Sequence, residues 1–443
     1  MRNGAVMEVQ TDVARAIDEL YLVDTHEHLT REQAWVESPR DILQDLFANY
    51  VPADLVVAGA TPDAVERLLD PSAGDLESRL AGVRNAWGAV RHTGYGEAVR
   101  LIASEVYGLD ELTLDGLARA QARLEELQQP GAMLRLLHET ARLDHVQIDD
   151  FTWACEADPA GPDFFLYDLS WLKFCNGVIE AEEILDETEI EVLGLEDLRA
   201  AMAAIFGRYA ACAIAVKSQH AYNRTLRWEE RTDEEAQSAL AAVLGGGEIE
   251  EATRLTLGDW CWARGVELAI EHNLPFKVHT GYYAGHSGMP VDRIPAGNLC
   301  ALLARYPEAR FVLMHTAYPY TDELVAIAKH YPNVWVDMCW AWSIDPYSSL
   351  DFVRRFLHAV PINKLFAFGG DTFSPTNSVA YSIQVRRWLT RALEAEVGAG
   401  DLTEQDAVRV AHRLMRENQY ECFDVEGTRA AVRAESERAA VSS

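Results

Sequence analysis

The sequence is short of basic residues and has no long apolar run. Only 39 lysines and arginines stand against 70 aspartates and glutamates, which gives a formal net charge of −31. Nucleic acids and anionic membranes bind basic surfaces, so we expect neither as a partner. No stretch of about 18 apolar residues could form a membrane span. The N-terminal stretch also lacks the apolar core of a signal peptide.

Paired cysteines and nucleotide-binding motifs are absent as well. The seven cysteines are scattered singly, with no C-x-x-C, so no disulfide framework is expected. Unpaired thiols are typical of a reducing compartment, which favours a cytoplasmic location. The first strand-turn has no G-x-G-x-x-G, and G-x-x-x-x-G-K-[ST] occurs nowhere, so dinucleotide and P-loop sites are not indicated. We therefore expect a small-molecule substrate, and leave a homo-oligomer open.

Short apolar runs that alternate with helical patterns dominate the chain from about residue 133 onward. Predicted strands cover 20–24, 145–148, 164–169, 213–216, 276–278, 310–314, 334–337 and 365–368. Strands separated by helices pair in parallel and are buried on both faces. About eight such units predict an α/β fold, a closed (β/α)8 TIM barrel. An open doubly wound sheet is the alternative.

The region from about 30 to 140 has a different rhythm. Its apolar residues recur at three and four positions, which predicts helices and no strands. We interpret it as a helical insertion after the first strand, within a single barrel domain that spans 1–423. The remaining residues, 424–443, are rich in alanine and glutamate and are expected to form a tail that is a frayed helix or disordered.

Polar side chains recur where the predicted strands end. His26 and His28 follow the first strand, and residues two apart on a strand project to the same face, so their imidazoles can converge on a metal such as zinc. Histidines two apart also occur by chance in loops, so the polar residues that follow several other strands are the stronger signal. Barrel enzymes carry their chemistry at this end of the strands. The polar residues that follow later strands are Lys217, His279, His315 and Asp371.

Six motifs carry a family resemblance. They are Asp24-Thr-His-Glu-His28, Lys217-Ser-x-x-Ala-Tyr222-x-Arg224, Phe276-x-x-His279-Thr-Gly281, Val312-Leu-Met-His315-Thr-Ala-Tyr-Pro319, Tyr331-Pro-Asn-Val-Trp-Val-Asp337 and Gly369-Gly-Asp371. In this order they resemble the amidohydrolase superfamily of metal-dependent barrel enzymes. Within it they are most similar to the amidohydrolase-related branch, which includes FluG-like proteins, non-oxidative aromatic decarboxylases and uronate isomerase. The resemblance covers the first strand and about 210–375, and is poor over 30–140.

The resemblance implies a TIM barrel of the metal-dependent hydrolase type, with a metal held by histidines and one carboxylate. Such ligands suit Zn best, with Mn or Fe as alternatives, and we favour one metal over two. Lys217 is either a carboxylated lysine that bridges two metals or an unmodified cation that binds a substrate carboxylate. The implied ligands are His26, His28, His279 and Asp371.

The resemblance also implies roles for other residues. Asp371 can serve as a general base as well as a ligand. His315 is either a ligand to a second metal or an acid/base group that stabilises an oxyanion. Substrate contacts are expected from Tyr222, Arg224 and His286, the last in a glycine-rich loop.

The predicted function is hydrolysis of a C–N or C–O bond, in an amide, lactone or related small molecule, through a metal-activated water. A non-oxidative decarboxylase or a sugar-acid isomerase on the same metal site is the alternative. A barrel that has lost catalysis and serves as a binding module is a third hypothesis, which the complete set of histidines and aspartate disfavours.

Overall fold

Eight parallel strands form one sheet in the order β1 to β8. The computed structural model describes residues 10–38, 40–283, 285 and 288–442. Each predicted strand is present, with its ends shifted by a few residues at most. The strands are β1 (Leu22–Glu27), β2 (Leu143–Ile148), β3 (Phe165–Ser170), β4 (Ala213–Ser218), β5 (Phe276–Val278), β6 (Phe311–Leu313), β7 (Val334–Asp337) and β8 (Leu365–Phe366).

Backbone hydrogen bonds close the sheet into a barrel at the seam between β1 and the segment that follows β8. The Thr25 amide donates to the Phe368 carbonyl at 3.2 Å, the Asp371 amide to the His26 carbonyl at 2.8 Å, and the His28 amide to the Thr372 carbonyl at 2.9 Å. All six residues of β1 are buried, as expected for a strand covered on both faces. The (β/α)8 TIM barrel is therefore confirmed.

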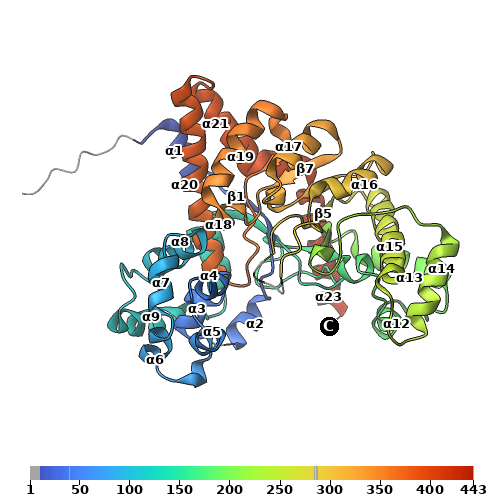
Figure 1. Ribbon diagram of the computed structural model, residues 1–443, viewed down its shortest axis with the longest axis horizontal. Helices are drawn as coiled ribbons and strands as arrows, with labels where there is room; N and C mark the ends of the chain where they lie inside the picture. The colour runs from blue at the N-terminus through green and yellow to red at the C-terminus, as the bar shows by residue number, and fades with distance from the viewer. Residues whose placement is uncertain (1–9, 39, 284, 286–287, 443) are drawn as a thin grey trace, which may run out of the picture.

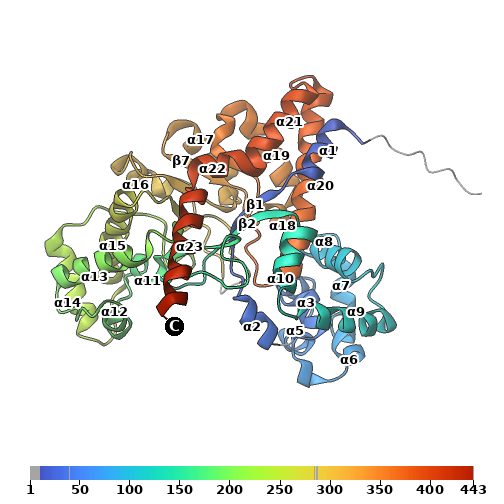
Figure 2. The same ribbon diagram turned by 180° about the vertical axis from the view of Figure 1, so that it is seen from behind.

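Helices cover the outside of the barrel (Figures 1 and 2). One helix precedes β1, short helices follow β3 and β7, and longer ones separate the later strands. They are α1 (Asp12–Glu19), α11 (Leu172–Cys175), α12 (Ala181–Thr188), α13 (Leu195–Tyr209), α14 (Asp233–Leu244), α15 (Glu251–Glu271), α16 (Cys300–Arg305), α17 (Thr321–His330), α18 (Ala341–Ile344), α19 (Pro346–Ala359), α20 (Pro375–Ala399), α21 (Glu404–His412) and α22 (Asn418–Cys422).

A helical lobe lies between β1 and β2 and stands to one side of the barrel in Figure 1, away from α12 to α16. Several of its helices begin at a side-chain cap, such as Thr61 before Pro62 and Asp41 in a capping box with Gln44. The lobe consists of α2 (Glu32–Glu37), α3 (Ile42–Phe47), α4 (Val51–Val57), α5 (Pro62–Leu69), α6 (Leu76–Ala81), α7 (Arg84–Val90), α8 (Gly94–Leu101), α9 (Leu114–Leu127) and α10 (Ala132–Arg135).

The lobe is tied to α20, the helix that follows β8. The Glu97 carboxylate of α8 accepts hydrogen bonds from Gln384 at 3.1 Å and from the Trp388 indole at 3.2 Å, and it pairs with Arg387. Asn49 donates to the Tyr381 hydroxyl at 2.6 Å. Because α20 begins just after the end of β8, these contacts fix the lobe over the carboxyl end of the barrel.

The opposite end of the barrel is closed by the C-terminal helix, α23 (Val425–Ser442), which Figure 2 shows running along the barrel. Phe423 and Val425 belong to the apolar cluster that fills the barrel interior. The Thr428 hydroxyl donates to the carbonyl of Ala213 at 3.3 Å, and Val432 is buried. The first half of this helix is therefore packed where a frayed or disordered tail was expected.

Candidate active site

Three of the predicted metal ligands meet at the carboxyl end of the barrel. His26 and His28 leave β1 toward the same side, and Asp371 follows β8. Nε2 of each histidine lies 3.3 Å from the same carboxylate oxygen, Oδ1 of Asp371. All three side chains are buried, and one ligand atom from each lies within 4.8 Å of the others. The barrel seam thus brings together residues 345 positions apart in the chain.

Hydrogen bonds fix the orientation of the His28 ring. Its Nδ1 lies 2.7 Å from the carbonyl oxygen of Asp149, an acceptor, so Nδ1 carries the proton. In the neutral ring Nε2 then presents a lone pair to Asp371. Although burial alone would lower it, the Asp371 carboxylate raises the pKa of His28. The lone pair on Nε2 of His28 and the carboxylate of Asp371 therefore both favour a positive charge between them.

A divalent metal fits this set of donors. Burial, and then the nearby Lys217 ammonium, lower the pKa of His26 well below its usual range, so this imidazole is neutral and able to bind a metal. Although burial would raise it, the His26 and His28 imidazoles on either side hold the pKa of Asp371 well below its usual range. Two imidazole nitrogens and a carboxylate are ligands that Zn, Mn and Fe accept.

Glycine is required directly before Asp371. A Cβ atom on Gly370 would lie 1.9 Å from Oε1 of Glu27, and one on Gly369 would lie 2.7 Å from Sγ of Cys339. The Glu27 side chain accepts hydrogen bonds at 2.6 Å from the Thr372 amide and from the Ser378 hydroxyl. The turn that delivers Asp371 is therefore packed against β1.

Lys217 lies at the end of β4 and is buried. Its Nζ is 3.2 Å from Nε2 of His26, the same nitrogen that faces Asp371. It also appears among the charges that lower the pKa of His279 and His315. The lysine is thus placed beside the three converging ligands, where either a carboxylated side chain or an ammonium group could act.

His279 and His315 form a second pair beside the first. Their ring centroids are 4.3 Å apart. Nδ1 of His315 lies 2.9 Å from the Cys339 carbonyl, and Nε2 lies 3.9 Å from Oδ2 of Asp371 with no hydrogen-bond partner in the described part of the chain. Burial lowers the pKa of His315 to about 4. Nε2 of His279 lies 3.1 Å from the Tyr282 carbonyl, so this imidazole is the least engaged with Asp371.

The backbone around these side chains is strained. Nine non-glycine residues have positive φ in the described ranges, and six of them follow β2, β6, β7 or β8 at this end of the barrel. Such conformations cost free energy and cluster at functional sites. The six are Phe151, His315, Thr316, Ala317, Trp340 and Asp371.

The predicted substrate residues have different surroundings. The Tyr222 ring lies 4.7 Å from the His279 ring and stacks on Tyr283, so it belongs to the site. Arg224 is instead buried against α15, where its guanidinium pairs with Asp259 at 2.5 Å and donates to the carbonyl of Cys175. Its hydrogen bonds are used within the protein, and the structure does not bring it to the metal ligands. His286 lies outside the described residues.

A buried ion pair under the site was not predicted from the sequence. Nζ of Lys277, on β5, lies 2.8 and 2.9 Å from the two oxygens of Asp168 on β3, and 2.7 Å from the Thr25 carbonyl. Asp168 is 3.9 Å from Nδ1 of His26. A lysine in the middle of a strand predicted to be buried on both faces is the signal that could have indicated this pair.

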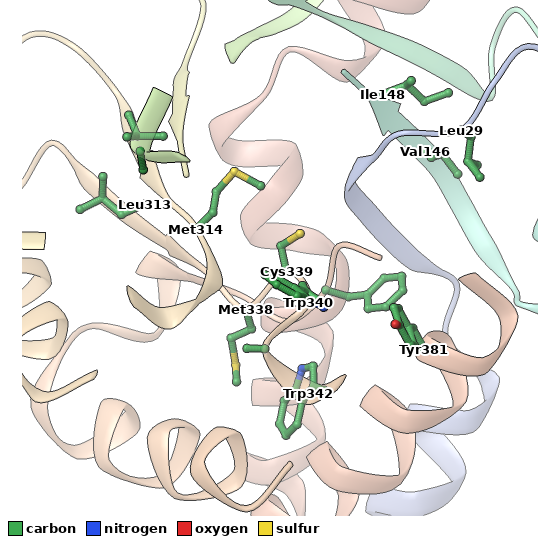
Figure 3. Packing of buried hydrophobic residues seen from close by; sticks show 14 of the residues in the cluster. Leu29, Val146, Ile148, Leu313, Met314, Met338, Cys339, Trp340, Trp342 and Tyr381 are labelled. Atoms are coloured by element: carbon green, nitrogen blue, oxygen red, sulfur yellow. The ribbon is translucent and has the colours of Figure 1, made fainter. Parts of the chain in front are cut away.

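Besides Tyr222, aromatic residues around the site were not predicted from the sequence. Tyr50, from the lobe, donates its hydroxyl proton to the Asp371 carbonyl. Its ring packs on Trp340 at 4.5 Å, and Trp340 contacts the His315 ring edge-on. Figure 3 shows Trp340 beside Cys339 in the segment after β7, with Tyr381 of α20 nearby. No pattern in the lobe sequence indicated that Tyr50 would reach Asp371.

Comparison with solved structures shows the same fold over nearly the whole chain. A uronate isomerase from Thermotoga maritima superposes with a TM-score of 0.77 at 12% identity, over 93% of this chain and 97% of that one. A glucuronate isomerase from Caulobacter crescentus gives 0.75 at 15% identity, over 93% and 92%. A protein from Lactobacillus casei described as a metal-dependent hydrolase gives 0.63 at 15% identity, over 95% and 99%.

Sequence comparison gives two further matches. Protein fluG of Emericella nidulans is 29% identical over 178 residues, which are 38% of this chain and 20% of that protein. The chain therefore spans about a fifth of this relative. In the described part of the chain no helix is long and apolar enough to cross a membrane.

A profile of the amidohydrolase family matches residues 193–418, which contain β4 to β8 with Lys217, His279, His315 and Asp371. The chain belongs to the amidohydrolase family, as the motifs indicated.

Proposed function

We propose that the protein is a metal-dependent hydrolase that cleaves a C–N or C–O bond of a small molecule. The observation that carries the proposal is that the two carboxylate oxygens of Asp371 face different groups. Oδ1 lies between Nε2 of His26 and Nε2 of His28, and Oδ2 faces the unpartnered Nε2 of His315 at 3.9 Å. One oxygen can hold a metal while the other accepts a proton, as a hydrolase requires.

His26, His28 and Asp371 would hold the metal, with zinc as the first choice and His279 as a further ligand. When bound, a divalent metal supplies positive charge that acidifies water and polarises a carbonyl group. One metal is favoured, because two histidine nitrogens converge on the single oxygen Oδ1 of Asp371, whereas the neighbouring group of His315, Cys339 and Asp371 has one histidine. Nζ of Lys217, only 3.2 Å from His26, is then available as a cation for the substrate.

Proton transfer falls to Asp371 and His315. The low pKa of Asp371 keeps it ionised at neutral pH, so Oδ2 can take a proton from the nucleophile and return it to the leaving group. Nδ1 of His315 donates to the Cys339 carbonyl, which leaves a lone pair on Nε2. In this tautomer the ring accepts a proton, and only its protonated form could donate to an oxyanion.

A sugar-acid isomerase is the second candidate. The observation in its favour is the likeness in fold to two uronate isomerases, which extends over 93% of the chain and so includes the helical lobe. An isomerase would use Asp371 and His315 to move a proton between neighbouring carbons. Because the ligand set is the same for both reactions, the reaction must be assigned by experiment.

The test combines metal analysis with isotope labelling. Purified protein is expected to contain about one zinc, manganese or iron per chain, and to lose it in His26→Ala but retain it in the control His330→Ala, which removes an exposed histidine of α17. A panel of amides, lactones and uronates is then incubated in ¹⁸O-labelled water. Label in a carboxyl product supports a hydrolase, and turnover restricted to uronates without that label would contradict it.

Asp371→Asn separates binding from chemistry. The amide keeps an oxygen for the metal but cannot take a proton, so we expect metal to be retained in part and kcat to fall by at least about 100-fold. Full turnover in this variant would remove Asp371 from the proposed role.

A further inference from the structure

We propose that the substrate carries an aromatic ring next to the bond that is cleaved, and that this ring stacks on the exposed face of Phe373, which together with Phe151 covers His28 at the entrance of the site. The inference rests on the proposed hydrolase function and names the substrate class of that same site. It starts from two exposed side chains that neither the fold nor the metal ligands require.

Phe151 and Phe373 are among the few large apolar side chains exposed to solvent, at 38% and 46%. Single exposed apolar residues are common and need no explanation. These two differ because both contact the same metal-ligand candidate. Phe151 follows β2 and Phe373 follows β8, so segments more than 200 residues apart place two rings on His28.

The two rings hold the His28 imidazole between them. Phe151 stacks on it at a centroid distance of 4.6 Å and an angle of 10°, and Phe373 at 5.1 Å and 18°. Both rings are thus nearly parallel to the imidazole, whose Nε2 edge faces Asp371. The exposed faces of the phenyl rings therefore point away from the imidazole, on either side of a candidate metal ligand.

Phe151 occupies its position at a conformational cost. Its φ is 65°, a left-handed conformation that a residue with a bulky side chain rarely adopts. Its amide donates to the Asp149 carboxylate at 3.0 Å, which holds the turn. Glycine or asparagine would adopt this backbone conformation at a lower cost, so the backbone alone does not account for a phenylalanine at this position.

Further rings pack in the buried layer around His315. Trp340, also with positive φ, lies after β7 and contacts Tyr50 of the lobe and Tyr282 after β5, at 4.5 and 5.8 Å. Figure 3 shows it in the packed interior at this end of the barrel. A planar ring can stack on the exposed face of Phe373, whereas a polyhydroxylated sugar would leave its hydroxyl groups unpaired against that face.

The charges near the site point the same way. Lys217 is a basic residue that borders the metal-ligand candidates. That ammonium already lies 3.2 Å from His26, and Arg224 is paired with Asp259. With a net charge of −31, the chain also repels anions. A neutral aryl amide or ester suits these surroundings better than a sugar acid.

The experiment uses three chelating probes with one head group. Benzohydroxamic, cyclohexanecarbohydroxamic and acetohydroxamic acid are titrated calorimetrically into metal-loaded protein, and metal content is measured for every variant. We expect benzohydroxamate to bind about tenfold more tightly than acetohydroxamate and more tightly than the cyclohexane probe, because aromatic stacking adds to area burial. This preference should disappear in Phe373→Ala and persist in Phe373→Tyr.

Two controls make the outcome decisive. Tyr347→Ala removes a more exposed ring, on α19, and should change nothing. If Phe373→Ala loses the metal, Phe373→Leu keeps an apolar cover on His28 and must still lose the aromatic preference. Equal binding of the three probes to metal-loaded wild type overturns the inference but leaves the proposed hydrolase standing. Absence of metal from wild type overturns the proposed function, and the inference with it.

Discussion

Removal of the Lys277 charge tests whether the polar barrel interior is held by the pair under the site. Nζ of Lys277 makes three hydrogen bonds, two to Asp168 and one to the Thr25 carbonyl, and both side chains are fully buried. Lys277→Met keeps much of the volume but leaves the carboxylate of Asp168 buried without its partner. Breaking a buried pair from one side costs about 3–5 kcal/mol.

The expected change in melting temperature follows from the size of the chain. Unfolding entropy near 60 °C is about 2.1 cal/mol/K per residue, or about 0.9 kcal/mol/K for a chain of 443 residues. The loss should therefore lower Tm by about 3–5 °C. Differential scanning calorimetry in the presence of a chelator measures this without any contribution from metal binding.

A double variant separates the unpaired charge from lost packing. Lys277→Met combined with Asp168→Leu replaces the pair by apolar groups of similar volume, and such replacements are often neutral or stabilising. We expect Tm to recover most of the loss, and an exposed control, Lys329→Met, to stay at the wild-type value. A single variant within about 1 °C of wild type, or a double variant less stable than the single one, would refute the reasoning.

Three further predictions concern other parts of the molecule. Tyr50→Phe removes the hydroxyl that donates to the Asp371 carbonyl, and kcat should fall by up to about tenfold with metal content unchanged; an unchanged kcat would show that this hydrogen bond is dispensable. Saturation with zinc at 100 times Kd should raise Tm by about 3 °C over the chelated protein, and calorimetry with and without a chelator checks this. Although burial opposes it, hydrogen bonds from His145 and Tyr420 hold the pKa of Asp144 well below its usual 3.8. Asp144→Asn should therefore lower the free energy of unfolding by a constant amount between pH 7 and 5. Below about pH 4 wild type loses the same stabilisation, because Asp144 becomes protonated as it unfolds, so urea unfolding should show the difference between the two proteins shrinking.

Periodicity carried most of the fold prediction. β5 and β7 have the predicted limits, because each is a short apolar run between a helix and a polar residue. β1 extends past the prediction to Glu27, since the polar residues of the His-x-His motif continue the strand. A charged residue inside a strand is unfavourable only if it has no partner, and here Asp24 and Glu27 face the turn around Gly370.

The site was predictable where its residues follow strands and unpredictable where they follow helices or loops. His26, His28 and Asp371 converge because parallel strands end at one edge of the barrel. Arg224 follows β4 in the chain, yet its guanidinium pairs with Asp259 on α15, and no local pattern reveals a partner 35 residues distant. Tyr50 reaches the site through tertiary packing alone, which periodicity does not describe.

The barrel seam has a consequence for how the chain matures. The first strand and the segment after the last strand meet through three backbone hydrogen bonds, and the candidate ligands come from either side of that seam. Residue 371 leaves the ribosome long after residue 26, so the three-ligand site cannot form until the chain has been made through residue 371. A metal that binds there would link two segments more than 300 residues apart, after the rest of the barrel has formed. Metal supply during synthesis should therefore govern the yield of closed barrel as well as the activity of the finished enzyme.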